Sequence, residues 1–535
     1  MSSKNNSPIS TTLNALYVLC SLIFVAAVAH HHVQLIQYPL PLSYIEPAIS
    51  AVTDYIASGK NPYALESQPS RTSVYPVLYN IMAAPLSDAF GNTLTMHRAL
   101  SAAFLAFCCA LFYSITYRFS QSHSDTLAVT AILYCGFMVY STPIASPNGI
   151  GLVLFFAALF LPTLANFSMR SLALSITLGV LAFHSKQYFI SALGFMALYL
   201  FLARGKRLGF YFGLLSFAAF MVSLAAILPG SPYYLDSLVF AVSAASQLGG
   251  NNAFMWQQWA EYLPVIWPVL TIIGAALIRY FTANKLASVK KGPQAWPTAR
   301  FTQWKAPLLS HELNPVWVFL ACSVFIFSFS LGRNPGNHLT YLFQIVAPFV
   351  LIIAATATAK ASWQRWPMRL LLLIAFATHY SVLSHDFSVQ EEDNWTEIKD
   401  RIGQADSIYA TTFALEHLVQ QGADIHNNGH TNYFQIAKYK PSFLKRTAAG
   451  ESVEELWQLW SQDIHSRISA QTFDLVVIDT WTPLPNLHLE DNSKANGNEL
   501  LAKYYKKIKQ IKIKLANRPG GGSYSVQIWE PNHER

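Results

Sequence analysis

The chain has 535 residues, of which 53% are hydrophobic, 14% aromatic and only 12% charged. The charged share is about half of that in soluble domains, so the composition excludes an ordinary soluble protein and predicts a multi-pass membrane protein. The formal charge of +8 invites comparison with nucleic-acid binders. Basic residues in short loops between apolar runs are, however, the usual topology signal, and we predict no nucleic-acid partner. All five cysteines lie within apolar runs, so neither a disulfide framework nor a thiolate metal set is expected.

Apolar runs near the length that crosses a bilayer recur along residues 1–386. They predict about eleven membrane helices, at roughly 13–36, 99–117, 126–143, 149–167, 171–185, 187–203, 208–230, 263–281, 315–332, 339–359 and 369–386. No small-residue cleavage site follows the first run, which favours a retained signal anchor. A cytoplasmic N-terminus places the basic loop residues, such as Arg118, Arg170 and Arg369, in the cytoplasm. The odd number of spans then leaves a large first loop, 37–98, and the tail 387–535 outside.

The first outer loop contains two short helical patterns separated by Gly and Pro residues. One pattern covers Ala48–Ser58, and the second runs from Val77 to Leu86 and ends in Pro85 and Gly91. Tyr75 is among the aromatic residues expected at the bilayer boundary. Glu46 lies just past the end of the first span, so this loop is a candidate active site.

Polar groups that the topology rule does not explain fall together at the outer ends of the spans. They are Glu46, Asp54, Arg71, Arg98, His184, Lys186, Gln187, Arg333, Asn334, Asn337 and His338. The spans contain no Asp, Glu, Lys or Arg away from their ends, whereas a transporter or proton pump is expected to carry several near the midplane. Any chemistry is therefore expected at one face. His30, His31 and His32 diverge by ~100° per residue on a helix and cannot all face one ion, so no metal or other cofactor is predicted.

The tail has the composition of a soluble domain. Strands are expected at 406–412, 473–479 and 523–529, and an amphipathic helix at 451–469, which together predict a small α/β domain. The basic stretch Lys503–Lys514 is either the solvated face of a helix or edge strand, or a contact with anionic headgroups or acceptor.

Several ordered motifs give the chain a family resemblance. They are YIEP at 44–47, GKNPY at 59–63, YPVLY at 75–79, RALS at 98–101 and Lys186-Gln187. With these motifs and its span count, the chain resembles the GT-C superfamily of polyprenyl-phosphate-sugar-dependent membrane glycosyltransferases. The resemblance implies an α-helical polytopic GT-C-like catalytic domain over 1–386, an extracytoplasmic α/β domain over 387–535, and a place in the bacterial plasma membrane. It also implies that Glu46, the acid of the first outer loop, is the catalytic base.

The chemistry of such a reaction fits these residues. A lipid-phosphate sugar already carries a competent leaving group, so the enzyme needs one base for the acceptor hydroxyl and cations for the departing phosphate. Glu46 is the first choice as base, with helix capping as its alternative role, and Asp54 is the second choice.

For the phosphate and sugar we select Lys186 first, with His184 and Gln187 beside it. The segment GRNPGNH follows, with Arg333, Asn334, Asn337 and His338, although an ordinary turn explains it equally well. Arg98, Arg71 and Tyr75 come third, with interface anchoring as the alternative.

The leading hypothesis is an inverting glycosyltransferase that moves a sugar from a polyprenyl-phosphate donor to a hydroxyl of a glycan, lipid or secreted protein such as a pilin. The alternatives are a flippase or transporter of lipid-linked sugars and a non-catalytic cell-envelope assembly protein. Arabinofuranosyl-, mannosyl- and aminoarabinose-transferase-like activities all remain open.

Overall fold

The structure is a computed structural model. It describes residues 8–43, 45–138, 143–239, 389–411, 450–479, 495–514 and 523–533, with a few shorter stretches, among them 369–370, 372–378, 414–415, 425–427 and 484–485.

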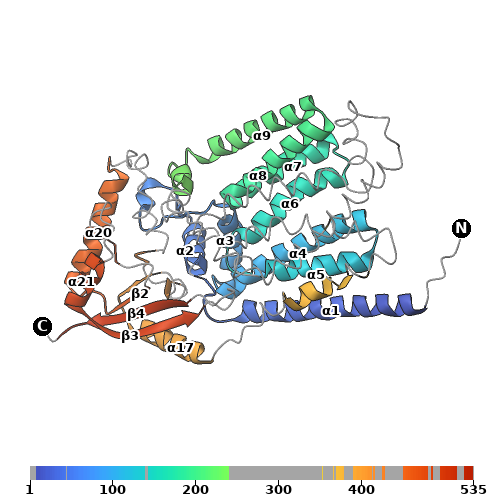
Figure 1. The fold of residues 1–535 in the computed structure, drawn as a ribbon. Coiled ribbons are helices and arrows are strands. Elements are labelled where there is room, and N and C mark those ends of the chain that lie inside the picture. Colours follow the sequence, from blue (N-terminus) through green and yellow to red (C-terminus); the bar gives the residue numbers. More distant parts are fainter. Residues whose placement is uncertain are drawn as a thin grey trace, which may run out of the picture.

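A bundle of apolar helices forms one half of the molecule (Figure 1). Its helices are α1 (Pro8–Gln37), α4 (Leu94–Ser120), α5 (His123–Phe137), α6 (Asn148–Leu164), α7 (Met169–Ser185), α8 (Ser191–Tyr199) and α9 (Lys206–Ile227), with short turns η2 (Gln187–Ile190) and η3 (Leu200–Arg204) around α8. Three helices in the described part are long and apolar enough to cross a membrane: Thr11–Gln37, Leu94–Ser120 and Lys206–Ile227. The apolar helices 148–164, 169–185 and 187–202 are shorter.

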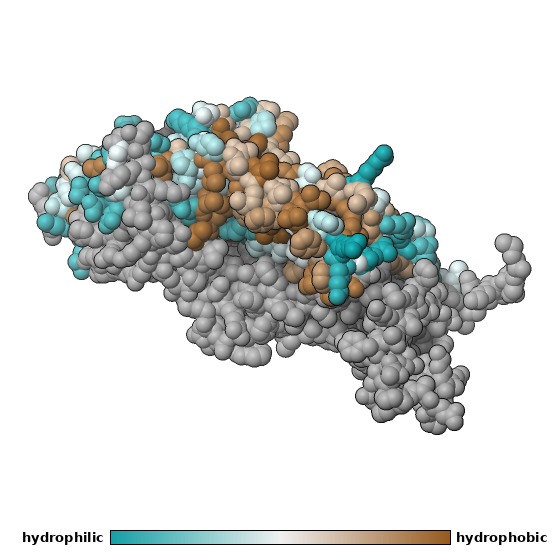
Figure 2. Space-filling view, turned by 90° about the horizontal axis from the view of Figure 1, so that it is seen from above, coloured by the Kyte–Doolittle hydropathy of each residue, from teal (hydrophilic) through white to brown (hydrophobic). Residues whose placement is uncertain are grey.

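The helices fall where the first seven apolar runs predict them. Most begin and end within a few residues of their run. There are two exceptions: the run 187–203 is divided between η2, α8 and η3, and α5 ends at Phe137, six residues before the end of the run 126–143. The predicted spans 263–281 and 315–332 lie outside the described residues. The span 339–359 does so except for Ile352, and the span 369–386 is described only in part, with helix at 372–378. Figure 2 shows hydrophobic side chains gathered on the bundle between more hydrophilic ends.

The first loop folds into two helices across one end of the bundle, α2 (Ile45–Ala57) and α3 (Leu78–Phe90), with a short turn η1 (Leu65–Ser67) between them (Figure 1). We call this end, where α1 finishes, the loop end. The helix expected from Ala48 begins three residues earlier, because Pro47 fits the first helical turn and Glu46 is anchored there. Pro85 does not end α3: the helix continues through it to Phe90, and Pro85 lies on the exposed face. The helix ends at Gly91, whose φ of 82° suits glycine.

The tail forms a four-stranded sheet with helices beside it. Its strands are β1 (Ile408–Ala410), β2 (Leu475–Asp479), β3 (Tyr505–Lys514) and β4 (Ser523–Pro531), in the order β1-β2-β4-β3, and only β1 and β2 pair in parallel. The helices are α17 (Val389–Gln404), α20 (Val453–Ser469) and α21 (Ala495–Tyr504). The strands and the helix expected at 451–469 are present. The basic stretch forms the edge strand β3, a position where lysines oppose pairing with other chains.

One hydrophobic cluster joins the bundle to the sheet. It includes Leu40 and Leu42 just after α1, Trp395 and Ile398 of α17, and Val526 of β4. This shared core fixes the tail against the loop end of the bundle.

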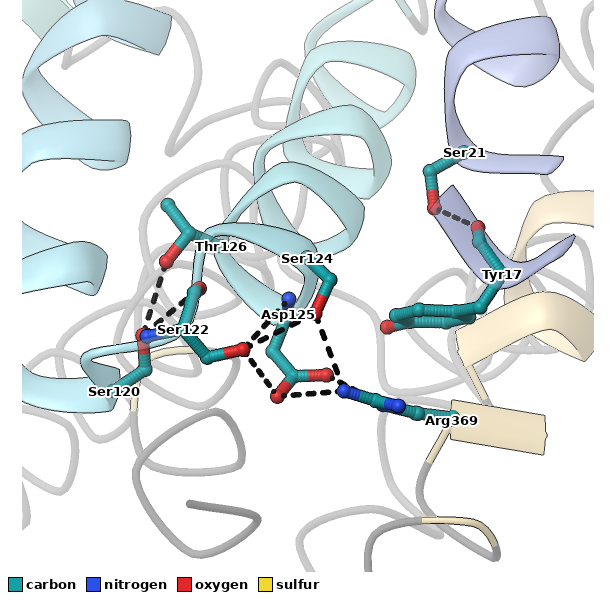
Figure 3. A network of polar contacts seen from close by, with 8 residues as sticks. All are labelled: Tyr17, Ser21, Ser120, Ser122, Ser124, Asp125, Thr126 and Arg369. Carbon is teal, nitrogen blue, oxygen red and sulfur yellow. Dashed lines mark hydrogen bonds and ion pairs between the residues drawn. The ribbon is translucent and has the colours of Figure 1, made fainter. Parts of the chain in front are cut away.

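A buried ion pair lies near the opposite end, where α1 begins (Figure 3). Arg369 donates from Nε to Asp125 Oδ1 at 2.9 Å, and its guanidinium lies 4.8 Å from the centre of the Tyr17 ring. Asp125 is in the first turn of α5 and Tyr17 is on α1. The contact therefore ties the segment around residue 369 to both helices.

Candidate functional site

Glu46 lies in a buried ion pair with Arg98 at the loop end. Both side chains are 0% exposed. Arg98 Nε donates to Glu46 Oε1 at 2.8 Å, and Arg98 Nη2 donates to Oε2 at 2.7 Å. Each carboxylate oxygen also accepts a backbone N–H, Oε2 from Leu42 at 2.6 Å and Oε1 from Ala145 at 3.0 Å. A carboxylate offers about four acceptor positions, so this conformation leaves none for a substrate hydroxyl.

Arg98 also closes the end of α1. Its two terminal nitrogens donate to the carbonyls of Leu35, Tyr38 and Leu40 at 3.0, 2.5 and 2.6 Å. These include carbonyls that the end of a helix leaves without helical partners. The ion pair therefore joins α1, α2 and α4 at a single point.

The short segment 143–148 connects this ion pair to Lys186. Ser101 of α4 holds the carbonyl of Ile144 at 2.8 Å, and Glu46 holds the N–H of Ala145. Three residues further on, Asn148 accepts a hydrogen bond from Lys186 Nζ at 2.8 Å. Three residues span at most ~11 Å of chain, so the segment holds Glu46 and Lys186 in one region.

Lys186 lies in the turn between α7 and η2 and is 7% exposed. Its ammonium is 5.3 Å from the centre of the Tyr75 ring and 5.4 Å from that of Tyr188. Burial lowers the pKa of Lys186 to about 7, which a bound anion would raise again. The positive end of the α6 dipole, at Asn148, also favours an anion in this place. A cation held by a neutral amide and two aromatic faces is well suited to a phosphate group.

Gln187 follows directly and begins η2. Its Oε1 is buried and, among the described residues, meets no hydrogen-bond donor. Buried polar atoms are nearly always satisfied, so this oxygen is suited to a substrate hydroxyl.

His184 has a different set of contacts from its neighbour Lys186. Its Nδ1 is 2.7 Å from Tyr234 Oη, and its Nε2 is 3.0 Å from Ser223 Oγ. Tyr234 stacks edge-on against Tyr63 at 4.9 Å between centroids, and Tyr63 Oη donates to the carbonyl of Tyr75 at 2.5 Å. The GKNPY motif thus fastens the first loop beside α7 and α9 and supports Tyr75 over Lys186.

Asp54 lies apart from the ion pair, at a cleft of about 460 Å³ lined by Asp54, Ala57, Ser87, Asp88, Gly91, Asn92 and Thr93. Burial raises the pKa of Asp54 against the opposing charges of Arg71 and Lys60, and Asp88 adds to the rise. Arg71 lies 5.7 Å from the Tyr55 ring centre. The structure thus places Arg71, from the loop after η1, beside Asp54 and Tyr55 of α2.

The remaining predicted site residues, Arg333, Asn334, Asn337 and His338, lie outside the described residues. The part of the chain that the structure describes contains no group of three His, Cys, Asp or Glu residues that could hold a metal ion.

Sequence reasoning missed Asn148, Tyr188 and Tyr234 as parts of this site. Asn148 could have been selected from the sequence, because it is a polar residue at the outer end of an apolar run, the same end at which Lys186 was expected. Tyr234 carried none, since its partner His184 is 50 residues away in sequence.

The fold of this chain, bundle and tail together, is similar to that of a solved structure, ArnT. The crystal structure of ArnT from Cupriavidus metallidurans bound to undecaprenyl phosphate aligns at a TM-score of 0.51 and 11% identity, over 95% of this chain and 97% of that chain. The apo state of ArnT aligns over the same shares, at 11% identity and a TM-score of 0.43. The sequence matches no family model and no curated protein.

Proposed function

We propose that this protein is an inverting glycosyltransferase that takes a sugar from a polyprenyl-phosphate donor at the outer face of a bacterial plasma membrane. The observation that carries the proposal is the buried Lys186 ammonium, held by Asn148 and flanked by Tyr75 and Tyr188. The fold supports it, because ArnT, the solved structure of similar fold, holds undecaprenyl phosphate.

The reaction needs one displacement. The acceptor oxygen bonds to the anomeric carbon while the bond from that carbon to the phosphate oxygen breaks, and the phosphate leaves with the electron pair. Lys186 stabilises the charge that develops on the phosphate, and Gln187 Oε1 accepts a hydrogen bond from a sugar hydroxyl. The acceptor's proton passes to a carboxylate base.

Two carboxylates are candidates for the base. Glu46 accepts four hydrogen bonds and is fully buried, so it serves as base only where Arg98 moves away from it. Asp54 is exposed at the cleft beside α3. Which carboxylate is the base therefore stays a prediction. In this conformation the hydrogen bonds of Glu46 favour a structural role, in which it holds Arg98 and the backbone of Leu42 and Ala145.

The cytoplasmic N-terminus and outer tail predicted from the basic residues place the loop end outside. The acceptor is a hydroxyl on a glycan, a lipid or a secreted protein. Purified protein given a radiolabelled polyprenyl-phosphate sugar and a mixture of cell-envelope acceptors tests the proposal. Transfer of label that depends on Lys186 supports it, whereas donor binding without any transfer by wild type favours a carrier of lipid-linked sugars.

A further inference from the structure

Helix α3 of the first loop has one buried face and one exposed face. The buried face consists of Tyr79, Asn80, Ala83, Ala84 and Ser87. The exposed face consists of Ile81, Met82, Pro85 and Ala89. These four positions follow helical spacing, so they share one side of α3, and none of them is polar. We call them the apolar face of α3.

Large hydrophobic side chains are exposed on α3 to a degree that is otherwise typical of the membrane helices. Ile81 is 50% exposed, Met82 39% and Phe90 73%. In the described residues of the first loop no other large hydrophobic side chain is exposed, and in the described part of the tail only Leu459 is. Most of the others lie on the apolar helices α1, α7 and α9. Exposed apolar patches mark a contact with another protein or with a membrane.

The neighbours of α3 show which way its apolar face points. The helix packs on α2, α4 and α7, and it lies between α2 and the bundle (Figure 1). Its exposed side therefore points sideways from the bundle, because α2 covers it on the outer side and the bundle on the inner side.

The level of α3 relative to the bilayer follows from its connection to α4. Only residues 91–93 separate α3 from α4, which is long and apolar enough to cross a membrane. A helix that lies across the end of a span is at the level where acyl chains meet headgroups. A face that points sideways at this level meets lipid.

We infer that α3 is an interfacial helix whose apolar face docks into the bilayer at the boundary between acyl chains and headgroups, on the loop-end side. Phospholipid is the occupant because the face lies beside a membrane helix and carries no charge or hydrogen-bonding side chain for a polar partner. The inference goes beyond the proposed transferase activity and does not depend on it.

Docking of α3 has a consequence for the cleft beside it. Asp88, the one charged residue of α3, lies outside the apolar face and, with Ser87, lines the cleft that Asp54 also lines. With the apolar face in lipid, the cleft opens at the level of the headgroups. A group carried on a membrane lipid can then reach it without leaving the membrane surface.

Photo-crosslinking of the full-length protein in a phosphatidylcholine bilayer tests the inference. Benzoylphenylalanine, which on irradiation bonds to neighbouring C–H groups, is placed at position 81 or position 90, and the bilayer contains radiolabelled phosphatidylcholine. Leu459 of α20 is the matched control, because its side chain is 54% exposed, close to the 50% of Ile81, but belongs to the tail. Leu215 of α9, 59% exposed, gives the yield of a lipid-facing position on a span.

We expect positions 81 and 90 to take up labelled lipid at a yield close to that of position 215 and several-fold above that of position 459. Lipid adducts at the level of position 459 would overturn the inference. Crosslinks to a second copy of the chain, or within the same chain, in place of lipid adducts would also overturn it, because protein would then cover the apolar face.

Wild-type protein provides the test if the substituted chains do not fold. A phosphatidylcholine with a diazirine on its acyl chain is added to the bilayer, and the adducts are mapped by mass spectrometry. Adducts on 78–90 as well as on α9 support the inference, whereas adducts on α9 with none on 78–90 overturn it.

Discussion

Replacing Glu46 with Gln should destabilise the protein strongly. The carboxylate and the Arg98 guanidinium are both 0% exposed, so the change leaves a buried cation without its counter-charge. Each carboxylate oxygen of Glu46 accepts two N–H donors, and in the variant the amide NH₂ of Gln replaces one of these oxygens, so that donors face a donor. Breaking a buried ion pair from one side costs about 3–5 kcal/mol, a large share of the ~5–15 kcal/mol that stabilises a typical domain.

The assay is thermal unfolding of purified protein in detergent, followed by size-exclusion chromatography. Glu66→Gln is the matched control, because Glu66 is exposed on the same loop and its loss should leave Tm unchanged. We expect Glu46→Gln to lower Tm by several degrees or more. Adding Arg98→Met should recover part of that loss, because the two residues form one contact and their effects are not additive.

The opposite pattern would refute this reasoning. If Glu46→Gln kept the wild-type Tm and donor binding while transfer fell by roughly a hundredfold or more, Glu46 would be the catalytic base and its role would not be structural. A selective loss of transfer in Asp54→Asn, with normal stability, would assign the base to Asp54.

Three further predictions concern the phosphate site and topology. Lys186→Ala should weaken undecaprenyl-phosphate binding about tenfold to a hundredfold, whereas Lys60→Ala, on an exposed loop, should change it little; equal small effects would make Lys186 a headgroup anchor. Because burial lowers the pKa of Lys186 to about 7 and an anion favours the charged form, wild-type affinity should be greatest below pH 7 and should fall by up to about tenfold per pH unit above it; a flat profile would contradict this. In intact cells, a membrane-impermeant thiol reagent should label Gln404→Cys and spare Gln121→Cys; the reverse result would place the loop end inside.

The positions of the membrane helices could be predicted from sequence because each depends on a local property, the length of an apolar run. The first predicted span, 13–36, lies within α1, and the run 171–185 becomes α7 with the same last residue. The start of α2 was misplaced by three residues because local periodicity does not register the anchoring of Glu46 by the distant Ala145.

The site was only partly predictable, because its residues can be selected from local sequence but their contacts join segments that are far apart in the chain. Glu46, Arg98, Lys186 and Tyr75 could be selected because polar or aromatic side chains at the outer ends of apolar runs are unusual. Their pairing could not be predicted, since Glu46 and Arg98 are 52 residues apart and Lys186 and Asn148 are 38 apart. Because of this pairing, Glu46 is not the free carboxylate that the sequence suggested but accepts four hydrogen bonds.

The most direct test of the central claim is the initial rate at which purified protein transfers label from a polyprenyl-phosphate sugar to a hydroxyl acceptor, measured for wild type and Lys186→Ala. We predict transfer by wild type and a loss of about tenfold to a hundredfold in the variant at subsaturating donor. No transfer by folded wild type that binds the donor, or equal rates in both proteins, would contradict the account.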